Sequence, residues 1–192
     1  LATAGWMVSL PDLRGHGASE GERGHTTGIP EPVRDIHSVR EHVAYRMPDA
    51  KSVVIGVGSG ALWAMAYALK HQDEVHGLVL AGPLLQDNFG APQKVGGMLG
   101  MFKKVEPLSP CVIPWKAEDV LSEPGDKGTW NADPKRDNTV TKGTVDAIVK
   151  AMAECPAPYA ALNMPTLVLA GSEDPICTPA DAAAFAKKLG AK

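Results

Sequence analysis

The segment from Ser52 to Lys70 constrains the fold of this chain most strongly. It reads SVVIGVGSGALWAMAYALK, an apolar run, a turn rich in glycine and a second apolar run. The first run, Ser52–Gly56, is short and β-branched, which predicts a strand covered on both faces. The second run, Ala61–Lys70, is long enough for a buried helix, and residues 58–60 form the turn between the two. The segment therefore predicts a strand–turn–helix unit with little exposed surface of its own.

The same alternation of strands and helices extends along the chain. Three more apolar runs predict strands, at Gly5–Asp12, Leu78–Ala81 and Met164–Gly171. Three segments with apolar residues at helical spacing predict helices, at Pro30–Met47, Thr141–Met152 and Pro179–Leu189. Strands that alternate with helices indicate an α/β fold with a parallel sheet covered by helices on both faces.

The composition changes after Gly82, where Gly, Pro, Lys and Met become frequent and apolar residues lose their spacing. The α/β pattern returns near residue 161. We therefore expect a core that begins with residues 1–82, an insert over residues 83–160 and a second part of the core over residues 161–192.

The overall composition excludes several classes of protein. Of the 192 residues, 44% are hydrophobic and 21% are charged, which is typical of a globular domain. The formal net charge of −3 gives no reason to expect a nucleic-acid partner. No apolar run is long enough to span a membrane, and the first residues lack the pattern of a signal peptide, so we expect a cytoplasmic protein. The three cysteines are too scattered for a disulfide framework or a CxxC metal site, and we expect no metal and no cofactor.

Two kinds of site use a tight glycine turn between a buried strand and a buried helix. One is the dinucleotide fingerprint G-x-G-x-x-G/A, which residues 56–61 match letter for letter. That fingerprint requires an acidic residue at the end of the next strand, where this chain has Ala81 and Gly82. A Rossmann-like domain is therefore only the third interpretation of this segment.

The other kind of site is the nucleophile elbow, G-x-S-x-G, which raises a serine at the edge of the sheet. The surrounding sequence favours the elbow. The loop DLRGHGASEGERGH (Asp12–His25) resembles the D-x-R-G-H-G-x-S-E-G loop of α/β-hydrolases of the monoacylglycerol lipase and serine aminopeptidase-like group. LVLAGPLL (Leu78–Leu85), NADP (Asn131–Pro134) and MPTLVLAGSEDPICTP (Met164–Pro179) are similar to the same group, so the resemblance covers nearly the whole chain.

The resemblance implies an α/β-hydrolase fold and hydrolysis of a carboxylic ester, such as a monoacylglycerol, through an acyl-enzyme. Asp174 matches the family's catalytic acid. Gly58, however, stands at the position of the nucleophile. Ser59 follows it, at the position whose backbone N–H donates to the oxyanion. A slip of one residue would make Ser59 the nucleophile, but Val57 and Ala61 would then replace the flanking glycines.

The catalytic histidine of the family follows the acid, whereas all six histidines of this sequence lie before residue 77. The sequence leaves open whether the chain is a fragment or a degenerate relative. Truncation would explain the histidine, but it does not explain Gly58. We therefore expect no triad-dependent hydrolysis by this chain as it stands. The alternative function is a non-catalytic module that binds a lipid or a protein.

The insert lies where members of the family carry a cap over the active site. Its apolar side chains are suited to a lid that receives acyl chains and contacts membranes peripherally. The expected partner is thus a small ester or a lipid. The residues expected to bind it are Leu84, Leu85, Phe89, Met98, Met101 and Phe102.

Overall fold

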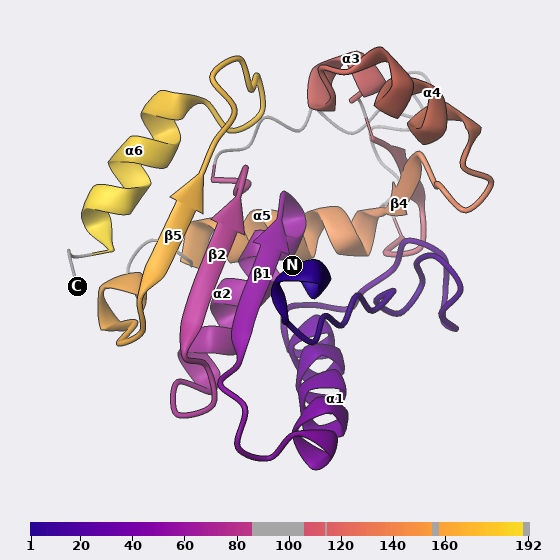
Figure 1. Ribbon diagram of the computed structural model, residues 1–192. Helices are drawn as coiled ribbons and strands as arrows, with labels where there is room; N and C mark the ends of the chain where they lie inside the picture. Colours follow the sequence, from indigo (N-terminus) through magenta and orange to yellow (C-terminus); the bar gives the residue numbers. More distant parts are fainter. Residues whose placement is uncertain (86–105, 114, 155–157, 190–192) are drawn as a thin grey trace, which may run out of the picture.

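A parallel sheet of three strands forms the centre of the computed structural model, which describes residues 1–85, 106–113, 115–154 and 158–189 (Figure 1). The strands are β1 (Val53–Val57), β2 (Gly77–Ala81) and β5 (Thr166–Leu169), in the order β1-β2-β5. Register pairs Val53 with Gly77, and Leu78 with Thr166. The sequence predicted all three strands, with every end within two residues of the observed one. Because the strands are parallel, their carboxyl ends lie at one edge of the sheet.

The four longer helices predicted around this sheet are confirmed. They are α1 (Pro30–Arg46), α2 (Ser59–Lys70), α5 (Lys142–Glu154) and α6 (Pro179–Lys188). Proline occupies the first turn of α1 and of α6, where its missing N–H costs nothing. The Thr178 side chain caps α6 by accepting a hydrogen bond from the Asp181 N–H.

The described part of the insert forms a small unit beside the sheet. β3 (Pro110–Val112) and β4 (Thr139–Thr141) pair antiparallel, and the short helices α3 (Ala117–Val120) and α4 (Pro124–Ala132) lie between them in the chain. α5 follows β4 and passes behind the sheet in Figure 1. Among the described residues, no helix combines the length and the apolar character that crossing a bilayer requires.

The hydrophobic core lies on one face of the sheet. α2 packs on β1 and β2, and nearly all of its residues from Ala61 to Ala68 are buried. α5 adds Ile148 and Ala151 to the same cluster, and α6 adds Phe185. The core therefore lies on the face of the sheet that carries Val54, Leu78 and Leu80. Helices from both ends of the chain contribute to it.

The opposite face of the sheet is apolar, and several of its side chains are exposed in the residues that the structure describes. The register places alternate residues of β1 and β5 on this face. Their side chains are 38–69% exposed because no described helix lies over them. They are Val53, Ile55, Val57, Leu167 and Leu169.

The predicted strand at Gly5–Asp12 is also wrong. Ala2–Ala4 form a single 3-10 turn, and residues 6–12 have no regular structure. A strand persists only when its N–H and C=O groups are paired. No described strand lies beside residues 6–12, so their apolar pattern produces no ladder.

The contact between β1 and α2 depends on glycine at position 56. A Cβ there would lie 2.6 Å from both the Ala61 Cα and the Gly60 carbonyl oxygen. These are backbone atoms, so they cannot move aside without shifting the whole helix. Gly60 lies in the same turn, but a Cβ on it would meet nothing within 4 Å.

This difference predicts opposite effects for two alanine substitutions in one turn. Gly56→Ala should lower the free energy of unfolding by about 3 kcal/mol or more, because overpacking forces strand and helix apart. Gly60→Ala should be neutral or stabilising by up to about 1 kcal/mol, because alanine is the better helix former. Urea unfolding of both variants measures the difference, and equal effects would contradict the packing described here.

Candidate functional site

The turn between β1 and α2 holds Gly58 in a conformation that few other residues adopt. Gly58 has φ 57° and ψ −122°, and it is the residue before the first turn of α2. Its N–H donates to the Ala81 carbonyl of β2 at 3.0 Å, and its carbonyl accepts from the Leu84 N–H at 3.3 Å. Hydrogen bonds therefore join the turn to Ala81, at the carboxyl end of β2, and to Leu84, which follows it. A Cβ at Gly58 would project into open space.

Ser59 is the first residue of α2, half-buried, and the helix has no side-chain cap. Its hydroxyl therefore does not satisfy the helix end, although capping would have been its ordinary structural role. Within the described chain, no acceptor is found for the Ser59 N–H. A free N–H at a helix N-terminus is suited to an anionic oxygen.

Asp174 lies at the same edge of the sheet, in the turn after β5. Its carboxylate approaches the end of β2 closely, since a Cβ on Gly82 would lie 3.2 Å from Asp174 Oδ2. Gly82 also donates its N–H to the Leu169 carbonyl at 2.8 Å. The ends of β1, β2 and β5 are thus linked through Gly58, Gly82 and Asp174, residues that are far apart in the sequence.

Hydrogen bonds from the backbone hold the Asp174 carboxylate in place. Oδ1 accepts from the N–H groups of Ile176 and Cys177 at 2.8 and 2.9 Å. Oδ2 is the oxygen that faces Gly82. Burial, with added repulsion from Asp174 and Asp181, raises the pKa of the Cys177 thiol to about 11, so this cysteine is protonated at neutral pH. The Asp174 carboxylate is thus the side chain of this turn that approaches the end of β2 at Gly82.

The structure describes two of the six residues expected to bind an acyl chain. Leu84 is buried in the hydrophobic core, and Leu85 packs against the same cluster. Their proximity to Gly58 follows from the hydrogen bond of the Leu84 N–H. The other four expected residues, Phe89, Met98, Met101 and Phe102, lie outside the described residues. A role in substrate binding stays a prediction for all six.

The glycine-rich loop Asp12–His25 is anchored to α1 and to β4. Arg14 donates two hydrogen bonds to the Asp35 carboxylate of α1, at 2.8 and 2.6 Å, and this pairing holds the pKa of Asp35 below its usual range. His16 Nδ1 lies 2.9 Å from the Arg14 carbonyl, and His25 Nδ1 lies 2.7 Å from Thr141 Oγ1. Both histidines therefore hold the loop together, as their ordinary structural role predicts.

A cluster at the other end of α2 was not singled out from the sequence. His37 of α1 stacks on His71, with ring centroids 4.3 Å apart, and Glu74 lies within 3.6 Å of an Nδ1 atom of each ring. Ligand atoms of these three residues lie within 4.8 Å of one another, the one such set among the described residues. The sequence offers one signal for this cluster: His37 lies in one predicted helix, and His71 directly follows the next one.

Two neighbours of Glu74 indicate that the cluster joins helices. Tyr67 donates a hydrogen bond to Glu74 at 3.0 Å, and Arg40 Nε lies 3.6 Å from the same oxygen. Burial favours the neutral acid, but the Tyr67 hydrogen bond and the Arg40 charge outweigh it and lower the pKa of Glu74. A cation already neutralises this carboxylate, so we interpret the cluster as an ion-pair contact between α1 and the end of α2.

Comparison with known proteins identifies the family of this chain. The family model described as serine aminopeptidase, S33, matches residues 1–192. A monoacylglycerol lipase of Mycolicibacterium smegmatis is 28% identical over 175 residues, which are 91% of this chain and 62% of the relative. The chain thus spans less than two thirds of that relative's length.

Solved structures show the same fold. The monoacylglycerol lipase of Paleococcus ferrophilus superimposes with a TM-score of 0.73 at 22% identity, covering 93% of this chain and 67% of that one. A soluble variant of the Saccharomyces cerevisiae monoglyceride lipase, in complex with a substrate analogue, gives a TM-score of 0.72 at 16% identity, covering 92% and 62%. The chain belongs to the serine aminopeptidase S33 family of α/β-hydrolases.

Proposed function

We propose that this chain carries the elbow and the acid turn of an acylglycerol-type ester hydrolase but does not itself form an acyl-enzyme. The observation that carries the proposal is Gly58, which occupies the strained turn after β1 with no side chain to attack an ester. Two relatives are named as lipases of monoacylglycerols, which supports a small ester or a lipid as the ligand class.

The missing step is nucleophilic attack. In a triad hydrolase, a serine oxygen attacks the ester carbonyl while a histidine takes its proton and an aspartate orients that histidine. Asp174 has the position and the hydrogen bonds for the last role, and the Ser59 N–H is free to donate to the oxyanion. Gly58 has no side chain and therefore no oxygen that could attack the ester, so this step cannot take place there.

Ser59 does not replace the missing nucleophile in this proposal. It begins the helix, one residue after the strained position, and the described residues place no histidine against its hydroxyl. A serine without a general base is a weak nucleophile near neutral pH, because its hydroxyl keeps its proton.

The first prediction of this proposal concerns covalent labelling of the chain. A fluorophosphonate probe should leave it unlabelled, and hydrolysis of p-nitrophenyl butyrate and of monooleoylglycerol should not exceed the rate in buffer. Intact-mass spectrometry after labelling is the measurement, with a serine esterase as the positive control. Ser59→Ala is the matched variant and should behave like the parent chain. Labelling of the parent at Ser59, lost in Ser59→Ala, would overturn the proposal.

The second prediction tests whether Gly58 holds the strained turn. Gly58→Ser should lower the free energy of unfolding by about 1–3 kcal/mol, because a side chain disfavours this positive φ although its space is open. Gly60→Ser, in the same turn but with helical geometry, should cost less than about 1 kcal/mol. Thermal unfolding of the two variants provides the comparison. A Gly58→Ser variant as stable as the parent would show that position 58 is not strained.

A further inference from the structure

Two histidines and a glutamate from three segments of the chain meet near the start of β2, and we call them the His–His–Glu cluster. His37 lies in α1, His71 follows the last residue of α2, and Glu74 lies in the turn before β2. Their ligand atoms lie within 4.8 Å of one another. Parallel strands begin at one edge of a sheet and end at the other, so the cluster lies at the opposite edge from Asp174.

One nitrogen of the cluster has no hydrogen bond. The His37 side chain is 36% exposed, but its Nδ1 atom is buried, and among the described residues this atom has no hydrogen-bond partner. Buried polar atoms are normally paired, so an unpaired one indicates a missing partner such as an ion or a water molecule. The nearest charged atom is Glu74 Oε2, at 3.6 Å. His37 therefore directs a free nitrogen toward a carboxylate that it does not hydrogen-bond.

The distances from the carboxylate to the two rings match those between ligands of one ion. His37 Nδ1 lies 3.6 Å from Glu74 Oε2, and His71 Nδ1 lies 3.4 Å from Glu74 Oε1. A charge-assisted hydrogen bond between these groups would be shorter, about 2.7–2.9 Å. Two ligand atoms that each lie about 2.0–2.1 Å from a tetrahedral ion are about 3.3–3.4 Å apart. Both distances are thus close to the spacing that a shared ion requires.

Neighbouring residues hold Glu74 in place as a ligand. Its N–H donates to the His71 carbonyl at 3.0 Å, and its own carbonyl accepts from the Ser52 hydroxyl. The buried Tyr67 donates a hydrogen bond to Oε2 at 3.0 Å, a contact of the kind that orients ligating carboxylates. Although burial raises the pKa of Glu74, the Tyr67 hydrogen bond and the Arg40 charge lower it overall, so the carboxylate is ionised at neutral pH.

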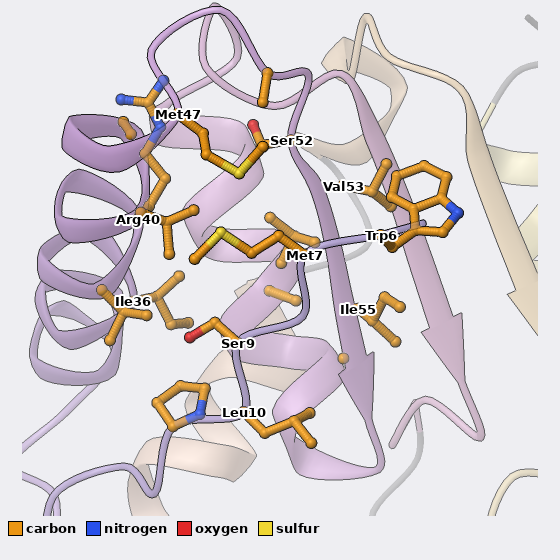
Figure 2. A pocket seen from close by; sticks show the side chains of 18 of the residues that line it. Trp6, Met7, Ser9, Leu10, Ile36, Arg40, Met47, Ser52, Val53 and Ile55 are labelled. Carbon is orange, nitrogen blue, oxygen red and sulfur yellow. The ribbon is translucent and has the colours of Figure 1, made fainter. Parts of the chain in front are cut away.

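Arg40 is the cation that an incoming ion would replace. Its Nε lies 3.6 Å from Glu74 Oε2, while a second nitrogen lies 2.9 Å from the Glu41 carboxylate. Arg40 therefore keeps a partner when Glu74 binds an ion. Arg40 also borders a pocket of about 590 Å³ between α1, β1 and the N-terminal segment (Figure 2). None of the three cluster residues lines that pocket, so the cluster is a separate feature.

We propose that His37, His71 and Glu74 bind a divalent transition-metal ion of the zinc type, which clamps α1 to the end of α2. Two imidazole nitrogens and one carboxylate oxygen are ligands that zinc accepts, whereas magnesium and calcium select oxygen ligands. Glu74 is 27% exposed, so solvent can supply both the ion and a water as fourth ligand. Without the ion, the residues keep the ion-pair contact through Arg40. The set contains no cysteine, so the scattered cysteines do not bear on it.

Binding requires one imidazole ring to turn. The two rings are stacked with 20° between their planes, and an imidazole holds a metal ion in the plane of its ring. One ion cannot lie in both of two nearly parallel planes. His71 lies between His37 and Tyr67, whose ring centroid is 4.7 Å away, and is 16% exposed. His37 is the outer and more exposed ring, so it is the ring that turns.

The direct test is calorimetric titration of the full chain with zinc chloride, after a chelator has removed bound metal. We expect one Zn²⁺ per chain with a Kd in the micromolar range. His37→Gln and His71→Gln should each weaken binding by about tenfold or more, because each removes one ligand. His42→Gln is the matched control, since His42 is an exposed histidine of α1 outside the cluster, and it should bind normally. If His71→Gln does not fold, Glu74→Gln should give the same loss.

Two further variants distinguish the cluster from a surface histidine that binds metal weakly. Arg40→Gln removes the competing cation and should tighten Zn²⁺ binding by about threefold or more. Tyr67→Phe removes the hydrogen bond that orients Glu74 and should weaken binding by about tenfold. Zn²⁺ should also raise the Tm of the parent chain but not that of His37→Gln, because only the parent gains a clamp between its helices.

Three results would overturn the proposal. The first is no saturable binding at Zn²⁺ concentrations up to about 1 mM. The second is an unchanged Kd in both His37→Gln and His71→Gln, which would place the ion elsewhere. The third is an equal loss of binding in His42→Gln, which would make exposed histidines in general the ligands. Because none of these measurements involves hydrolysis, their results are independent of the proposal on Gly58.

Discussion

The close approach of α2 to β1 at Gly56 is the contact on which the rest of the structure depends. With no Cβ at this position, the helix backbone lies directly against the strand. The chain must then reverse within a single residue, and Gly58 takes the positive φ that this reversal requires. The same turn hydrogen-bonds to Ala81 and Leu84, so it also locks β1 to β2. The absence of a Cβ at Gly56 thus sets how closely α2 approaches β1, and with it the position of the turn at the carboxyl edge of the sheet.

That edge brings together the residues of the proposed site. The Asp174 carboxylate is oriented by two backbone N–H groups and faces Gly82. Ser59 begins α2, and no acceptor for its N–H is found among the described residues. In the proposed site, Gly58 stands where a serine nucleophile would be expected; glycine suits the positive φ of this turn better than serine does, but it provides no reactive atom. At position 58, the residue that suits the backbone conformation best is therefore one that could not perform the proposed reaction.

The rest of the sheet is asymmetric. Its core face is covered by α2, α5 and α6, whereas Val57 and Leu169 on the other face are exposed. Among the strands that the structure describes, none pairs with the outer edge of β1. These features explain together why residues 6–12 have the pattern of a strand but not its structure. A strand needs a neighbour for its backbone, and a composition that favours strands does not provide one.

The sequence by itself determined the local elements and the candidate turn. The helix start at Pro30, the cap at Thr178, the apolar runs of β1 and β2, and the glycines at 56 and 58 are encoded over a few residues, since capping, apolar periodicity and backbone freedom are local properties. The sequence also placed Asp174 in the turn after a strand. Only the tertiary structure decided that Asp174 faces Gly82, that His37 and His71 share Glu74, and that Val57 and Leu169 are exposed on one face of the sheet. These features depend on which distant segments lie side by side, and burial and pairing are properties of that arrangement, not of any single segment.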